Sequence, residues 1–153
     1  MKEYRITKYN PQNRVAGVYT RDEWTSISDI GKSFNNIPLT YEMYQKTEDA
    51  YIDCCIEMLK RATVKELAVE QVEYYTEDSI FPAVVSNFEE IRQIISACLR
   101  EKCWLKLTAT EFFIHFGYDY YMYIGSNLPV VTVEEVAEKY GLFCEQYPSP
   151  YNT

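Results

Sequence analysis

The single histidine, His115, is the side chain in this sequence best suited to acid–base chemistry near neutral pH. It alternates with bulky aromatic residues in the run Phe112–Phe116, a pattern typical of a strand. A general base also needs a positioned partner within hydrogen-bond distance. The residues alone favour a half-buried histidine bonded to a tyrosine or a carbonyl. A small enzyme or ligand-binding pocket that uses His115 with tyrosine and aspartate neighbours stays as the alternative.

Other catalytic signatures are missing from the sequence. It has no nucleophile elbow, no phosphate-binding glycine loop and no metal-ligand spacing. The five cysteines include the adjacent pair Cys54 and Cys55 but no Cys-x-x-Cys motif, so buried thiols in a reducing compartment are expected rather than disulfides. A zinc site that recruits His115 is disfavoured because the cysteines lack the spacing expected of zinc ligands. We therefore expect no cofactor, no metal ion and no enzymatic activity.

A second candidate site is the tyrosine-rich run that begins Tyr118, Asp119, Tyr120, Tyr121. As a hairpin, it would present phenol rings on one face with Asp119 at its tip. Tyrosine is frequent among interface hot spots, so the run predicts an aromatic contact surface. Cross-strand aromatic pairing that only stabilises a sheet explains the same pattern equally well.

The segment from Arg21 to Gly31 crowds carboxylates, hydroxyls and a tryptophan together without a helix or strand period. Asp22 and Glu23 could bind a basic group of a partner, and Trp24 could anchor the contact. In the second interpretation Trp24 fills the edge of the core, while Asp29 and the neighbouring hydroxyls bond the local backbone. The residues alone favour this second interpretation.

The net charge of -8 is unevenly distributed. Residues 63–90 hold one basic and seven acidic side chains, among them Glu73, Glu77 and Asp78, and residues 111–153 hold one basic and six acidic ones. Nucleic-acid binding is not expected, because phosphate contacts need clustered Lys and Arg. A basic partner protein fits this charge, and acid retained for solubility fits it as well.

A chain of 153 residues with 47% hydrophobic content has the size and composition of one globular domain. No segment is apolar enough to span a bilayer, so no membrane association is expected. The first residues lack the apolar run of a secretory signal, which predicts a cytoplasmic location.

The hydrophobic periodicity predicts a single α+β domain over residues 1–153, with a mainly antiparallel sheet, including a C-terminal β-meander, packed against about three helices. Helices are expected at residues 40–61, 87–103 and 132–141, and strands at 2–9, 104–107, 112–116 and 120–124. Residues 64–75 fit a helix or a bulged strand, and we favour the strand. Residues 10–38 are expected to form a long connection, with a helical turn near 28–34. The tail from about residue 146 is expected to be loose.

Three runs carry a resemblance to known proteins: Tyr4–Pro11, Glu23–Gly31 and His115–Tyr123. They resemble a family of small bacterial immunity proteins that accompany polymorphic or contact-dependent toxins, and the resemblance covers most of the chain. It implies a stoichiometric protein that binds and neutralises one cognate toxin, for example a basic nuclease. It carries over no catalytic residues.

The resulting hypothesis is a cytoplasmic, non-enzymatic protein that binds its toxin through an acidic, tyrosine-rich surface. The expected contact residues are Glu73, Glu77, Asp78, His115 and the hairpin Tyr118, Asp119, Tyr120, Tyr121, with Asp22, Glu23, Trp24 and Asp29 contributing. A housekeeping interaction module with a different partner remains a further alternative.

Overall fold

The computed structural model describes residues 1–77 and 80–152, and its main feature is one seven-stranded sheet in the order β11-β1-β10-β9-β8-β6-β7. Every neighbouring pair in this sheet is antiparallel. The strands are β1 Lys2–Thr7, β6 Leu67–Tyr74, β7 Val84–Val85, β8 Cys103–Ala109, β9 Phe112–Phe116, β10 Met122–Ser126 and β11 Phe143–Gln146. The predicted α+β class with a mainly antiparallel sheet is confirmed.

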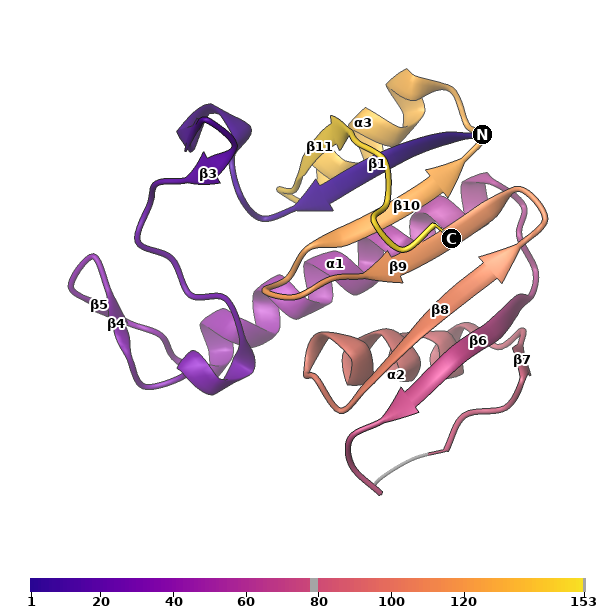
Figure 1. Cartoon of the computed structure of the whole chain (residues 1–153), viewed down its shortest axis with the longest axis horizontal. Coiled ribbons are helices and arrows are strands. Elements are labelled where there is room, and N and C mark those ends of the chain that lie inside the picture. The colour runs from indigo at the N-terminus through magenta and orange to yellow at the C-terminus, as the bar shows by residue number, and fades with distance from the viewer. Residues whose placement is uncertain (78–79, 153) are drawn as a thin grey trace.

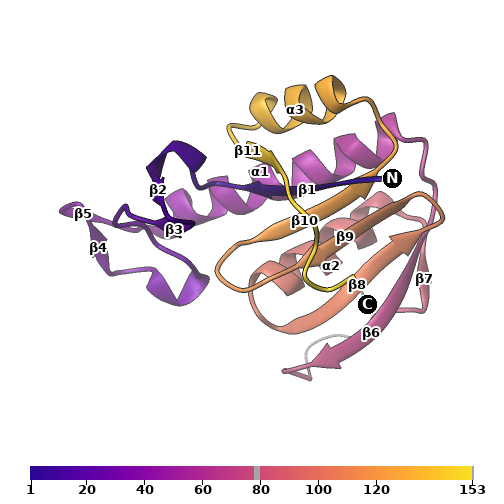
Figure 2. The ribbon, with the colours of Figure 1, turned by 45° about the horizontal axis from the view of Figure 1, so that its top comes forward.

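Three α-helices among the described residues cover one face of this sheet (Figures 1 and 2). They are α1 Tyr41–Arg61, α2 Phe88–Leu99 and α3 Val130–Lys139, and α1 packs against both of the others. The Thr40 hydroxyl accepts the Met43 N–H, and the Asn87 side chain accepts the Glu89 N–H. Each cap satisfies a donor that the first turn of a helix leaves free, so both predicted helix starts are confirmed.

Three helix boundaries differ from the prediction: the end of α2, the start of α3 and the end of α3, which lies at Lys139 rather than at residue 141. Helix α2 ends at Leu99, four residues early, because Glu101 adopts a left-handed φ of 61° and the Lys102 N–H turns back to the Ala97 carbonyl. Helix α3 starts two residues before the expected Thr132, directly after Pro129, and the N–H of Thr132 bonds to the Pro129 carbonyl. The predicted helix start at Thr132 is therefore wrong.

The ambiguous segment before α2 forms strand β6, and its register shifts between Glu70 and Glu73, as expected for a bulged strand. Strand β10 starts at Met122 rather than at residue 120. Asp119 and Tyr120 have left-handed φ values of 59° and 66°, so they belong to the turn between β9 and β10. The predicted hairpin is present, but its turn takes up part of the tyrosine-rich run.

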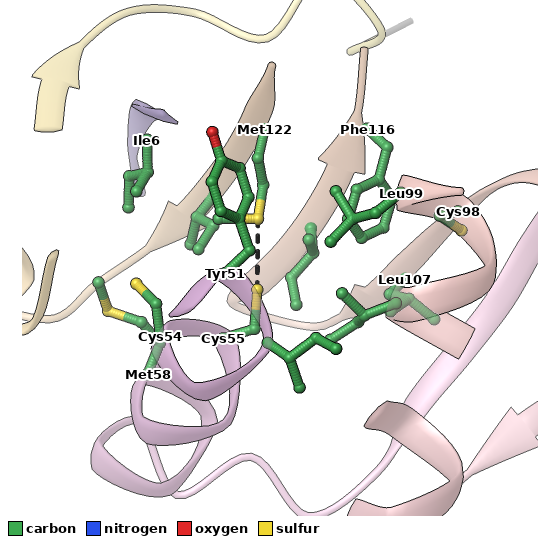
Figure 3. Close-up of a cluster of buried hydrophobic side chains, with 14 of the residues drawn as sticks. Ile6, Tyr51, Cys54, Cys55, Met58, Cys98, Leu99, Leu107, Phe116 and Met122 are labelled. Carbon is green, nitrogen blue, oxygen red and sulfur yellow. Dashed lines mark hydrogen bonds between the residues drawn. The ribbon is translucent and has the colours of Figure 1, made fainter. Parts of the chain in front are cut away.

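The core lies between the sheet and the helix layer (Figure 3). Phe112, Ile114 and Phe116 point into it from β9, as their alternation predicts. On α1 the thiol of Cys55 donates to the Met122 sulfur at 3.4 Å, and burial raises the pKa of Cys54 well above its ordinary value. These cysteines are packing residues.

Residues 10–38 form a projection that extends away from the sheet near the N-terminal end of α1 (Figure 1). It holds two short hairpins and two 3-10 turns: β2 Arg14–Val15 with β3 Val18–Tyr19, β4 Ser33–Phe34 with β5 Ile37–Pro38, η1 Pro11–Asn13 and η2 Ile27–Asp29. The helical turn expected near residues 28–34 is the η2 turn, and it begins one residue earlier and ends sooner.

The C-terminal segment crosses the sheet face opposite the helices (Figure 1). The Arg5 guanidinium carbon lies 4.0 Å from the centre of the Tyr147 ring, and the buried Ser149 donates its N–H to Glu3 at 3.0 Å. The tail expected to be loose is therefore packed on β1 and its neighbours. The sequence did not indicate this, because Tyr147 and Ser149 find their partners far away in the chain.

Gly125 provides a test of the packing on this outer face. A Cβ atom at this position would lie 2.1 Å from Cε2 of Phe113, whose ring is stacked on His115 with ring centres 4.1 Å apart. We expect Gly125→Ala to lower the free energy of unfolding by about 1–3 kcal/mol, measured by chemical denaturation. In a Phe113→Leu background the same change should cost less than half as much. An equal cost in both backgrounds would contradict the clash.

Candidate functional site

A cleft of about 620 Å³ lies at the end of the sheet where β6 stops and β8 begins. It is formed by the end of β6, the end of α2 and the turn that follows it, the start of β8, the end of β9 and its turn to β10, and the C-terminal tail. The side chains that line it are mostly aromatic, acidic or sulfur-bearing: Glu73, Tyr75, Cys98, Glu101, Cys103, Trp104, Phe116, Tyr118 and Tyr151. None of the described lining residues is Lys or Arg.

The aromatic side chains Trp104 and Tyr151 of the cleft are fixed by contacts with neighbouring segments. The indole N–H of Trp104 donates to the Phe116 carbonyl at 2.8 Å, which ties β8 to the end of β9. The Tyr151 ring lies against Trp104 with ring centres 5.5 Å apart. A Cβ on Gly117 would lie 3.3 Å from the Tyr151 hydroxyl, so the glycine lets the tail approach the β9–β10 turn closely. The Trp104 ring therefore has little freedom to turn.

The acidic side of the cleft is formed by Glu73 and Glu101, both exposed. The Tyr75 hydroxyl donates to Glu73 at 3.0 Å. Partial burial, this hydrogen bond and the charge of Glu73 raise the pKa of Tyr75 to about 12. At neutral pH the cleft thus presents a neutral phenol beside carboxylates and can accept hydrogen bonds from a cationic donor.

The structure brings only two of the predicted contact residues, Glu73 and Tyr118, into this cleft. Tyr118 is 81% exposed. Glu77 is also exposed but is not among the lining residues, and Asp78 lies outside the described residues. Sequence analysis missed Tyr75, Glu101, Trp104 and Tyr151. Of these four residues, only Tyr75 could have been identified from the sequence, because it lies two residues after Glu73 in an acidic segment. Glu101, Trp104 and Tyr151 are brought to the cleft only by the fold.

The expectation that the tyrosine-rich run presents its phenol rings on one exposed face is wrong for Tyr120 and Tyr121. Tyr120 is 3% exposed, because its left-handed backbone turns the ring into the core. Tyr121 is half-buried, stacks on Tyr9 with ring centres 5.4 Å apart and accepts a hydrogen bond from Arg14. Asp119 is exposed at the turn, and its carbonyl accepts the Tyr9 hydroxyl at 2.6 Å. Most of the tyrosine-rich run is therefore structural.

Tyr120 belongs to a buried polar network that links the β9–β10 turn to the helices. Its hydroxyl donates to that of Tyr44 at 2.6 Å, and the Tyr44 hydroxyl donates to Glu48. Glu48 is 1% exposed and accepts two bonds from the Arg100 guanidinium, at 2.6 and 3.1 Å. Ser96 donates to the same carboxylate. A hollow of about 460 Å³ lies over this network, but the Glu48 and Arg100 charges at its base already satisfy each other.

The predicted residues of the 22–29 segment are engaged within the chain. Trp24 packs on Tyr120 with ring centres 5.1 Å apart, and Glu23 forms an ion pair with Lys8 at 2.7 Å. Although partial burial acts in the opposite direction, the Thr25 N–H and the Lys32 ammonium hold the pKa of Asp29 below its usual range. The exposed Asp22 accepts the Asn35 N–H. These contacts match the interpretation in which the segment fills the edge of the core.

His115 lies beneath the C-terminal tail, beside a small hollow of about 290 Å³. Its Nδ1 is 2.7 Å from the Ser149 hydroxyl, and the Lys106 ammonium, which also lines the hollow, bonds to the Tyr151 carbonyl. Burial and the charge of Lys106 lower the pKa of His115 to about 4. The histidine is therefore neutral at pH 7, and its bond to Ser149 holds the tail on the sheet.

Three further findings extend beyond the cleft. Over the described ranges, no group of three or more His, Cys, Asp or Glu side chains is placed to hold a metal ion. None of the helices in the part of the chain that the structure describes is long and apolar enough to cross a membrane. No family model, curated protein or solved structure matches this chain.

Tyr120 is buried and Tyr118 is exposed, so substitution of each by alanine should have a different effect on stability. Tyr120→Ala should lower the free energy of unfolding by about 3–5 kcal/mol, because it removes a buried ring and leaves Tyr44 without its donor. Tyr118→Ala should change it by less than about 0.5 kcal/mol, because the ring is exposed. Denaturant unfolding of both variants measures the difference. Similar losses would contradict the assignment of Tyr120 to the core.

His115 should make stability depend on pH within a defined window. Its folded-state pKa of about 4 lies below the ordinary value of 6.5, so the unfolded chain takes up a proton first as the pH falls. The contribution, about 3 kcal/mol at most, is fully present above pH 6.5 and is lost as the pH falls towards 4. His115→Asn should flatten the unfolding free energy across this window.

A second acid-sensitive group gives the control for this measurement. Hydrogen bonds from Lys139 and Tyr140 lower the pKa of Glu57 to about 2. Its stabilising contribution is therefore lost only as the pH falls below 4.5 towards 2, and His115→Asn should leave that lower part of the profile unchanged. An unaltered slope between pH 6.5 and 4 would show that His115 does not titrate in this way.

Proposed function

We propose that this chain is a non-enzymatic immunity protein that binds and neutralises a cognate bacterial toxin. The observation that carries the proposal is the cleft at the end of the sheet, where five aromatic side chains and two carboxylates converge without a basic lining residue among those described. Rigid aromatic surface with directed polar groups is the usual make-up of a protein–protein contact. The family resemblance of the sequence points to the same class.

The charge of the protein supports a basic partner. The chain carries 23 acidic and 15 basic side chains, and several of the basic ones are paired internally. Arg5 pairs with Glu145, and Arg92 pairs with Asp53. The acidic side chains of the cleft thus lie on a protein with excess negative charge, which favours rapid association with a positively charged partner such as a basic nuclease.

The alternative function is a small enzyme or ligand-binding domain at His115. It is favoured by the hollow of about 290 Å³, where His115 and Lys106 lie near each other. Against it, burial and the charge of Lys106 lower the pKa of His115 to about 4, whereas a general base works best with a pKa near the operating pH. A neutral, buried histidine that anchors the tail needs no substrate to explain it.

Protection in a bacterial host tests the proposal. The proposal predicts an adjacent upstream gene for a large secreted protein with a variable C-terminal domain, and that domain is the toxin to use. Induction of that domain should stop growth, and co-expression of this chain should restore it. The purified pair should form a complex whose association rate falls at least about tenfold between low and high salt.

Stoichiometry separates binding from catalysis in the same assay. Neutralisation by binding requires at least one molecule of this chain for each toxin molecule, so titration of the toxin's activity should end near equimolar ratio. Neutralisation at a small fraction of that ratio would indicate an enzyme and contradict the proposal. Growth arrest that this chain does not relieve, with no complex formed, would also contradict it.

A further inference from the structure

The cleft at the end of the sheet combines aromatic rings with carboxylates, and the chain binds two of its own cationic side chains with the same groups. The Lys8 ammonium lies 4.2 Å from the centre of the Trp24 ring and 4.4 Å from that of Tyr9, and it pairs with Glu23 at 2.7 Å. An aromatic pair with one carboxylate thus holds a cation whose side chain is 9% exposed. The attraction combines cation–π and charge-assisted hydrogen bonding.

Arg5 repeats the arrangement on the outer face of the sheet. Its guanidinium carbon lies 4.0 Å from the centre of the Tyr147 ring, and the group donates to both carboxylate oxygens of Glu145, at 3.3 and 3.0 Å. Stacking on one side and a two-point hydrogen bond on the other is the recognition mode specific to arginine. Two cations of the chain are therefore held by the same two components.

The cleft contains those two components, but its lining includes neither Lys nor Arg among the described residues. Trp104 and Tyr151 provide a fixed pair of ring faces, inclined at 60° to each other. Glu73 and Glu101 provide two carboxylates, and Tyr118 provides a third, exposed ring. The lining is thus complementary in charge to a cation that comes from another molecule, and its rings offer faces on which such a cation can stack.

We propose that this cleft binds an arginine side chain of the partner protein, with the guanidinium against Trp104 and Tyr151 and its N–H groups donating to Glu73 and Glu101. The identity of the partner as a toxin rests on the proposed function. The volume of about 620 Å³ exceeds that of one side chain, so the cleft also accommodates the residues that flank the arginine.

Nucleic acid is excluded as the occupant by charge. Aromatic clefts also stack nucleobases, but such sites combine the rings with basic side chains that follow the phosphates. Here the charged lining is acidic, and the whole chain carries a net charge of -8. A phosphate backbone would be repelled, whereas a guanidinium would be attracted.

A pair of peptides tests the cleft directly. The probes are acetyl-Gly-Arg-Gly-amide and the same peptide with citrulline, which keeps the shape of arginine and lacks its charge. The readout is the NMR signal of the Trp104 indole N–H in the intact chain. The arginine peptide should shift this signal in a saturable way and bind at least about tenfold more tightly than the citrulline peptide. Equal binding of the two peptides, or no shift, would overturn the proposal.

Matched charge variants complete the test. Glu73→Gln with Glu101→Gln should weaken arginine-peptide binding at least about tenfold. The control, Glu134→Gln with Glu135→Gln, removes the same charge from exposed positions on α3 and should leave binding within about twofold. Equal weakening by both pairs would show that general charge, and not the cleft, attracts the peptide.

The toxin complex separates this inference from the proposed function. Tyr118→Ala combined with the two cleft glutamine substitutions should weaken toxin binding at least about tenfold, without loss of thermal stability. If this triple variant protects and binds like the unaltered chain, the cleft proposal fails while the immunity function stands. If the unaltered chain gives no protection, the immunity function fails, and the peptide experiment still decides whether the cleft binds arginine.

Discussion

The packing of helices α1 and α2 depends on one buried charge, the carboxylate of Glu48. A carboxylate that is 1% exposed needs compensation, since an unpaired charge in a protein interior is strongly destabilising. Arg100 supplies the charge from the residue after α2, and Tyr44 and Ser96 supply further donors. This requirement fixes how α1 and α2 pack against each other.

The same network reaches the sheet and the N-terminal projection. Tyr44 accepts the hydroxyl of Tyr120, whose carbonyl in turn accepts that of Tyr51. Trp24 packs on both Tyr44 and Tyr120, so the 22–29 segment is held by the same rings. The turn that positions Tyr118 is thereby rigid at its base, which leaves an exposed ring on a fixed support. Such preorganisation lowers the entropic cost of binding a partner.

Features of this structure were predictable from the sequence when the interacting residues lie close together along the chain, and were missed when they lie far apart. The caps at Thr40 and Asn87 and the alternation in β9 depend on near neighbours, and they were predictable. Helix α2 ended early because of a left-handed turn at a glutamate, which residue type alone does not indicate. The C-terminal tail and β11 were missed because their partners lie on β1 and β9, far away in sequence. The cleft was missed for the same reason, and only Glu73 on β6 and Tyr118 in the β9–β10 turn were predicted among its lining residues.

The position of β1 has a consequence for how the chain folds as it is made. This strand lies between β10 and β11, with Lys2 opposite Ser126 and Tyr4 opposite Gln146. Strand β1 thus finds both of its partners only after all the residues between it and β10 have been synthesised. Both of its edges stay unpaired until then, and unpaired edges are templates for wrong pairing. Closure of the sheet is therefore expected to be slow, because it depends on pairing between strands that are far apart in the sequence.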